Sequence, residues 1–191
     1  MVSVNLPKGI NYEKYSNMTM GSASSIWGPA LWISLFTCIM GRYPYKIDKN
    51  NIEHIKIRNA FKFTLLNLSN TMPCIFCRNS FKVFVKELPI SNFLVGRIEL
   101  MYWLYKIKDK VNKKLICQER ICYNDEKKRL KKLYYKKDGT LNAEEYYKKV
   151  ELFKKNVFLT VSSPPFEDVL DKYESYRAVC NKKAKICSLP K

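Results

Sequence analysis

Apolar residues recur at helical spacing in four consecutive segments of the chain. In the last of these segments, Met101, Leu104 and Ile107 follow one another at intervals of three residues, which places them on one face of a helix. Alternation typical of strands is absent between the turn signals. Four helices joined by short connections predict an all-α fold, an antiparallel four-helix bundle. The segments run from Ile26 to the residues before Pro44, from Asn51 to Asn70, from Pro73 to Pro89, and from Arg97 to Leu115.

The residue composition differs on either side of these segments. Residues 1–25 are polar and rich in small residues, which is typical of a flexible leader. Beyond Leu115 come a basic run, the turn signal Asp138-Gly139, an amphipathic stretch over 141–157 and a short helix predicted over 166–179. Three parts are therefore expected: a leader (1–25), a bundle domain (26–115) and a basic helical extension with a cysteine-containing tail (116–191).

The charge of the chain predicts an affinity for polyanions. Its 191 residues include 35 Lys and Arg against 17 Asp and Glu, a net charge of +18. Nucleic acid binding through Lys127 to Lys137 is one interpretation, and compositional drift on a solvated surface is the other. The most apolar stretch, residues 26–40, is shorter than the roughly 20 residues that cross a bilayer. We expect neither a transmembrane segment nor a signal peptide.

The scarcity of histidine and the abundance of cysteine limit the chemistry. With His54 as the only histidine, a site that needs two imidazoles is excluded. Seven cysteines are many for the reducing compartment that the absence of a signal peptide implies, and repeated thiols there indicate metal binding or redox chemistry. Cys38 lies on an apolar helical face, where a buried thiol is expected.

The most specific feature is the C-x-x-C pair Cys74 and Cys77. At the start of a helix, two cysteines at this spacing share one face and are close enough to form a disulfide. The helix N-terminus stabilises a thiolate, which lowers the pKa of the better-placed thiol. Thr71 is positioned to cap this helix. The pattern predicts a redox-active pair.

Two other interpretations of the cysteines stand beside this one. Cys74 and Cys77 could be half of a zinc site completed by Cys117 and Cys122, which would make the chain a zinc-stabilised helical protein. They could also be an inert buried pair. A thioredoxin fold is disfavoured because no strand precedes Cys74.

Several ordered motifs around the cysteines resemble the Erv/ALR family of FAD-linked sulfhydryl oxidases over residues 26–115. The versions encoded by large cytoplasmic DNA viruses, of the mimivirus-like type, are the most similar. The motifs are Trp27-Gly28-Pro29-x-x-Trp32, Tyr43-Pro44, Met72-Pro73-Cys74-x-x-Cys77-Arg78, Glu87-Leu88-Pro89-Ile90, Trp103-Leu104-Tyr105, and Lys108-Asp109-Lys110-Val111-Asn112-Lys113-Lys114-Leu115.

The resemblance implies a bundle that holds FAD beside the C-x-x-C pair. Cys77 would pass electrons to FAD, and Cys74 would exchange with an incoming dithiol. Reduced FAD would hand the electrons to O2, so that hydrogen peroxide is the product. Trp32 and Tyr43 would line the flavin site. The remaining implied contacts come from Gly28 and Asp109 and from an adenine and ribose clamp of Val111, Asn112 and Lys114.

Three positions depart from the family pattern. Phe36 and Lys108 stand where the family has histidines, and Tyr105 stands where some members have a structural cysteine. Phe36 could stack on an aromatic ring, and Lys108 could bind a phosphate or lie along the adenine. A catalytically degenerate member of the family is therefore an alternative.

The resemblance also implies a second dithiol that carries electrons from the substrate. Cys180 and Cys187, near the C-terminus, are favoured slightly over Cys117 and Cys122. The expected partners are dithiol proteins of viral origin and O2, the expected assembly is a homodimer, and the expected location is the host cytoplasm or the virion.

Overall fold

The computed structural model describes residues 23–135, 140–181 and 186–188, and these residues form an all-α fold with one short C-terminal hairpin. The predicted fold class is confirmed. The elements are α1 (Ser24–Arg42), α2 (Ile52–Thr71), α3 (Ile75–Glu87), the 3-10 turn η2 (Ile90–Phe93), α4 (Arg97–Leu133), α5 (Ala143–Val157), α6 (Phe166–Glu174), β1 (Val179–Asn181) and β2 (Ile186–Ser188).

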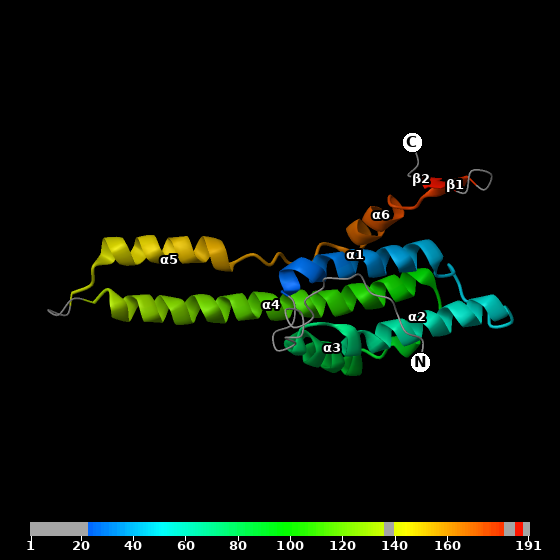
Figure 1. Ribbon diagram of the computed structural model, residues 1–191, viewed down its shortest axis with the longest axis horizontal. Coiled ribbons are helices and arrows are strands. Elements are labelled where there is room, and N and C mark those ends of the chain that lie inside the picture. Colours follow the sequence, from blue (N-terminus) through cyan, green and yellow to red (C-terminus); the bar gives the residue numbers. More distant parts are fainter. Residues whose placement is uncertain (1–22, 136–139, 182–185, 189–191) are drawn as a thin grey trace, which may run out of the picture.

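A four-helix bundle forms around the first half of α4. Leu100, Met101, Trp103, Leu104 and Ile107 are fully buried there, and they belong to a core shared with α1, α2 and α3. The indole nitrogen of Trp103 donates to the carbonyl of Leu88 at 2.9 Å, which satisfies its one polar atom. Figure 1 shows α1 on one side of α4 and α2 and α3 on the other.

The apolar helix α1 contributes three buried residues to the core of this bundle. Among the described residues it is the one helix long and apolar enough to cross a membrane by length and composition. Phe36, Ile39 and Met40 nevertheless lie buried in the bundle core. Packing within the fold therefore accounts for the apolar character of these positions.

The helix predicted to end at Leu115 continues without a break to Leu133, so that expectation was wrong. Beyond residue 115, α4 leaves the bundle and pairs with α5, forming a two-helix arm (Figure 1). Leu130, Tyr146 and Val150 make a small core of their own between the two helices. Tertiary contact with α5 preserves the helix where its sequence becomes mostly polar.

The structure also tests the expected start of α2, the expected end of the last helix and the expected burial of Cys38. Helix α2 begins after Asn51, whose side-chain oxygen accepts from the backbone N–H of Glu53 and His54. The last helix ends at Glu174 rather than Val179, which instead begins β1. Cys38 is exposed, so the expected buried thiol was wrong. The turn at Asp138-Gly139, residues 136 and 137 of the basic run, and residues 1–22 of the leader lie outside the described residues.

Candidate functional site

The C-x-x-C pair lies at the N-terminus of α3, as its spacing predicted. Cys74 is the N-cap residue, and its sulfur accepts a hydrogen bond from the backbone N–H of Cys77 at 3.3 Å. The expected cap, Thr71, is instead the last residue of α2 and donates to the carbonyl of Leu68, so that expectation was wrong. Arg78 donates to the carbonyl of Met72 at 2.8 Å and thereby fixes the turn that leads into Cys74.

The two thiols differ in acidity. Burial, the largest effect, raises the pKa of Cys74, but hydrogen bonds from Cys77 and Phe76 and the charge of Lys114 lower it below its ordinary value overall. Burial raises the pKa of Cys77 to about 11, with the hydrogen bond to Cys74 adding to the effect. Cys74 is therefore the cysteine of the pair that is more readily a thiolate.

A cavity of about 450 Å³ opens between α1, α3, α4 and α6, and Cys77 lines it. Its walls are mostly apolar and aromatic, with Trp27 and Trp32 from α1 and Phe81 from α3. A mainly apolar cavity of this size, with a few polar groups, is typical of a small-molecule or cofactor site.

Lys108, Lys114 and Lys172 bring three positive charges to the same cavity, whose lining includes no Asp or Glu among the described residues. Lys114 donates to the hydroxyl of Ser80 at 2.5 Å. Burial lowers the pKa of Lys108, and the neighbouring charge of Lys172 lowers it further. An aromatic cavity with an excess of ammonium groups fits a planar ring system joined to phosphate groups, so the residues present fit FAD.

Of the cofactor residues suggested by sequence, seven line this cavity and three do not. Phe36 is buried behind the wall and stacks on Tyr173, with ring centroids 4.8 Å apart. Tyr43 is also buried, and its hydroxyl donates to the carbonyl of Leu94 at 2.8 Å. Asp109 forms an ion pair with Lys113 at 2.7 Å. The seven that line the cavity are Gly28, Trp32, Cys77, Lys108, Val111, Asn112 and Lys114.

Sequence reasoning missed the contribution of α6. Lys172 and Tyr173 line the cavity, although they lie in the extension that the resemblance does not cover. Their element was predicted as a helix, but nothing in its local pattern says where it packs. Met72 and Trp27 also line the cavity, and both stand in motifs that sequence analysis had singled out.

The remaining cysteine pairs have different geometries. Cys117 and Cys122 are exposed free thiols on one continuous helix. Five residues along an α-helix separate their Cα atoms by about 8–9 Å. That is too far for a disulfide, so a bond between these two cysteines would require unwinding the helix. Cys180 is disulfide-bonded, and in the β1–β2 hairpin it stands directly opposite Cys187.

The zinc interpretation finds no support in the geometry. Within the described ranges, no group of three or more His, Cys, Asp or Glu side chains is arranged to hold a metal ion. Cys74, Cys77, Cys117 and Cys122 all lie in those ranges, and they do not come together as a four-thiolate site.

One of two comparisons with known proteins gives a match. The family model described as Erv1 / Alr family matches residues 29–134, which is more than half of the sequence. A search of curated proteins finds no match. The matched range covers the bundle and the outer half of α4, and it ends before α5 and α6.

Proposed function

Because the chain belongs to the Erv1/Alr family, which is known for FAD-linked sulfhydryl oxidase activity, we propose that it oxidises dithiols to disulfides. In each cycle two thiols lose two electrons and two protons, one S–S bond forms, and O2 is reduced to hydrogen peroxide. FAD, when bound, supplies the chemistry that accepts an electron pair from a thiolate and passes it to O2.

The observation that carries the proposal is that Cys77, one member of a C-x-x-C pair, lines an aromatic and positively charged cavity. Cys74 does not line that cavity, and it is half-buried at the N-cap of α3. The pair therefore has an inner sulfur for the cofactor and an outer sulfur for the substrate.

Cys74 and Cys77 have different roles in thiol exchange. In the disulfide form of the pair, a substrate thiolate attacks the sulfur of Cys74, a mixed disulfide forms, and Cys77 leaves as a thiolate. The second substrate thiolate then attacks the mixed disulfide and leaves Cys74 as a thiolate. The backbone N–H of Cys77 and the charge of Lys114 stabilise that thiolate, which makes Cys74 a good leaving group.

The hairpin supplies the proposed shuttle dithiol. Its register places Cys180 opposite Cys187, which supports a pairing between these two cysteines. Cys180 is exposed and disulfide-bonded, so it is open to attack by a substrate thiolate. We favour this pair over Cys117 and Cys122, whose helical positions oppose a bond between them.

The setting of the reaction follows from the same resemblance. The family is typically dimeric and acts on thiol substrates. We propose that this chain forms a homodimer, that it is encoded by a large DNA virus, and that it oxidises viral proteins in the host cytoplasm or the virion. A mass measurement in solution tests the dimer, and a monomer would contradict it.

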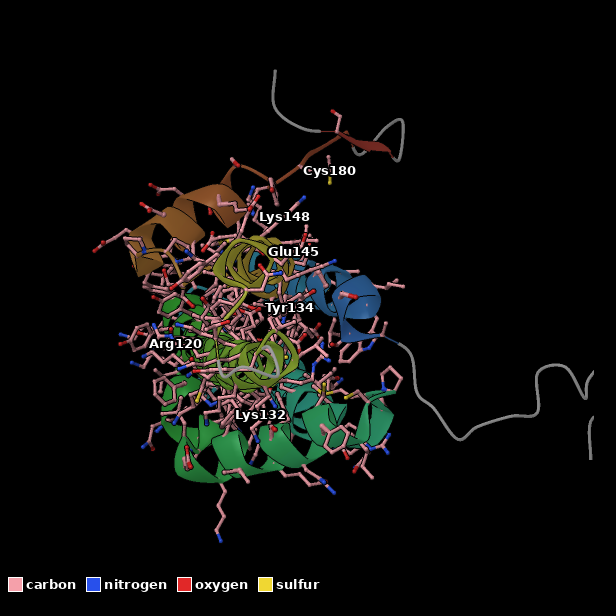
Figure 2. The ribbon with its side chains drawn as sticks, turned by 90° about the vertical axis from the view of Figure 1, so that its left-hand side faces the viewer. Arg120, Lys132, Tyr134, Glu145, Lys148 and Cys180 are labelled. Atoms are coloured by element: carbon pink, nitrogen blue, oxygen red, sulfur yellow. The ribbon has the colours of Figure 1, made fainter. Side chains whose placement is uncertain are left out.

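A second candidate function, binding of nucleic acid, rests on a groove of about 490 Å³ in the arm. Lys127, Lys128 and Lys131 of α4 line it together with Tyr146 and Tyr147 of α5. Figure 2 looks along the arm and shows Arg120 and Lys132 on α4 and Lys148 on α5. Lysines beside tyrosines suit phosphates and stacked bases. Affinity for single-stranded DNA that falls steeply with salt would support this function, and salt-independent binding or no binding would refute it.

Oxygen uptake with a small dithiol tests the oxidase directly. The FAD-loaded chain should consume O2 and produce an equal amount of hydrogen peroxide. Cys77→Ser should abolish both, while Cys38→Ser, which changes an exposed thiol outside the cavity, should leave both unchanged. An FAD-loaded wild-type chain that consumes no O2 would identify the chain as a catalytically degenerate member of the family.

A further inference from the structure

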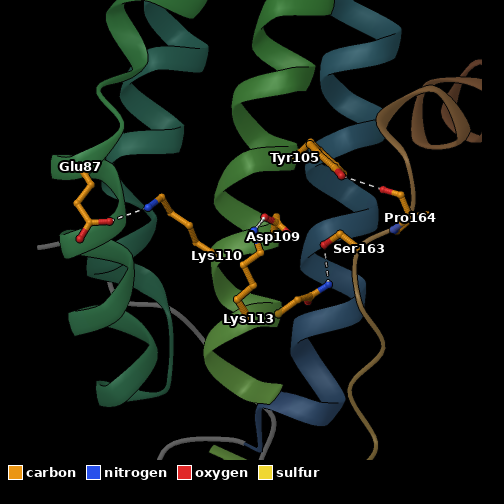
Figure 3. Close-up of polar contacts among 8 residues, drawn as sticks. Glu87, Tyr105, Asp109, Lys110, Lys113, Ser163 and Pro164 are labelled. Carbon is orange, nitrogen blue, oxygen red and sulfur yellow. Dashed lines mark hydrogen bonds and ion pairs between the residues drawn. The ribbon is translucent and has the colours of Figure 1, made fainter. Parts of the chain in front are cut away.

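Hydrogen bonds along α4 hold the segment that precedes α6. Residues 158–165, called the strap below, run beside α4. Tyr105 donates its hydroxyl to the carbonyl of Pro164 at 2.8 Å, and Asn112 donates to the hydroxyl of Ser163 at 3.1 Å (Figure 3). Glu119 accepts from both the backbone N–H and the hydroxyl of Thr160.

These three anchors recur every seven residues on α4. Residues 105, 112 and 119 therefore lie on one stripe of the helix. The strap follows that stripe back toward the bundle and brings α6 against α1 and α4. Tyr105 stands where some family members have a structural cysteine, and here it anchors the extension.

Helix α6 then packs as part of the bundle. Val169 and Tyr173 belong to the main core, and Tyr173 is only 6% exposed. The ring of Tyr173 stacks on Phe36 with an interplanar angle of 18°. Phe36 occupies one of the two positions where the family has a histidine, so an element outside the family-matched range packs against this departure from the pattern.

Lys172, the residue before Tyr173, adds charge to the same cavity. It lines the cavity together with Lys108, which stands at the other substituted histidine position, and the charge of Lys172 disfavours the charged form of Lys108. Among the described residues, no carboxylate forms an ion pair with either lysine. Two neighbouring cations of this kind are stabilised by an anion that binds both.

We propose that α6 completes the cofactor site, with Lys172 and Lys108 binding the diphosphate of the dinucleotide and Tyr173, backed by Phe36, forming part of the aromatic wall. The inference rests on the proposed function, because it takes FAD as the ligand. It assigns a cofactor-binding role to a helix that lies outside the residues matched by the family model.

Equilibrium binding of FAD to the full chain tests the inference. Lys172→Gln removes the charge from an exposed side chain, so the fold should be retained. Loss of one charge-assisted contact predicts a dissociation constant for FAD raised about tenfold. Riboflavin, which has no diphosphate, should bind both proteins equally. Lys172→Arg should restore FAD affinity, and added salt should weaken FAD binding less in Lys172→Gln than in the wild type.

Lys148→Gln is the matched control, because Lys148 lies on α5 in the arm and its loss changes the net charge equally (Figure 2). It should leave FAD binding unchanged. If Lys172→Gln binds FAD as tightly as the wild type, the inference is wrong while the oxidase proposal stands. If the wild-type chain does not bind FAD at all, both fall.

Discussion

Two cysteine-bearing regions of this chain, the first turn of α3 and the C-terminal hairpin, hold their thiols in opposite ways. Cys74 and Cys77 are free, three residues apart on a helix, and half-buried beside a cavity. Cys180 is exposed, disulfide-bonded and opposite Cys187 in a two-stranded ribbon beyond α6 (Figure 1). Cross-strand pairing places two cysteines seven residues apart opposite each other, just as one helical turn places two cysteines three residues apart on the same face.

The difference assigns different tasks to the two regions. Cys77, which lines the cavity, can meet a bound cofactor, whereas the exposed, disulfide-bonded Cys180 of the hairpin can meet a protein. In the proposed function they form a relay in which electrons enter at the hairpin and leave at Cys77. Three substitution experiments and one alkylation experiment test this division of labour.

Cys77→Ser should have the largest effect. Without the sulfur that lines the cavity, turnover with any dithiol should fall by at least about 10³-fold. FAD should still bind, because serine has nearly the same shape as cysteine and leaves the other side chains that line the cavity unchanged. Oxygen uptake and bound flavin are the two measurements. Turnover that persists would show that Cys77 is not the inner sulfur.

Cys180→Ser should distinguish the role of the hairpin from the role of the C-x-x-C pair. Turnover with a protein dithiol should fall about tenfold or more, because the tethered shuttle no longer raises the local concentration of thiol near Cys74. Turnover with dithiothreitol, which reaches Cys74 directly, should change little. An equal loss of turnover with both substrates would show that Cys180 supports the structure of the site and does not carry electrons from the substrate.

Alkylation of the reduced, flavin-free protein should distinguish the two thiols of α3. The pKa of Cys74 is lowered, so its thiolate forms at lower pH than an ordinary thiol, and its alkylation should level off first as pH rises. The pKa of Cys77 is raised to about 11, so its rate should keep rising toward that pH. Mass spectrometry of the two labelled positions across pH gives both rates. The reverse order would contradict the hydrogen-bonding direction at the N-cap.

Replacing both Cys117 and Cys122 by Ser should have the smallest effect. Both thiols are exposed on α4, where surface substitutions change the free energy of unfolding by at most about 0.5 kcal/mol. Turnover with protein dithiols should also stay unchanged. A clear loss of turnover with protein substrates alone would show that Cys117 and Cys122, rather than the hairpin cysteines, form the shuttle.

The sequence predicted the bundle and the position of the C-x-x-C pair because both depend on local patterns. Helical spacing of Met101, Leu104 and Ile107 follows the burial of one face, and a C-x-x-C pair needs only one helical turn. The motifs of the resemblance also led to seven of the residues that line the cavity. Their role in holding FAD remains a prediction.

The parts that could not be predicted depend on tertiary contacts. The expected helix end at Leu115 came from a change in composition, but α5 packs on the polar half of α4 and keeps it helical. Lys172 and Tyr173 reach the cavity only because the strap runs back along α4. The excess of Lys and Arg over Asp and Glu is also larger in the first 115 residues than in the extension, although the extension contains the basic run. Residues 1–115 carry 17 Lys and Arg against 6 Asp and Glu, and residues 116–191 carry 18 against 11.

Anaerobic reduction of the flavin by a dithiol tests the central claim most directly. The purified chain, supplied with FAD, should be yellow, and its flavin absorption should bleach when a dithiol is added without O2 and return when air is admitted. Cys77→Ser should keep the absorption and lose the bleaching. A wild-type chain that binds FAD but shows no bleaching would contradict the claim that the sulfur of Cys77 passes electrons into this cavity.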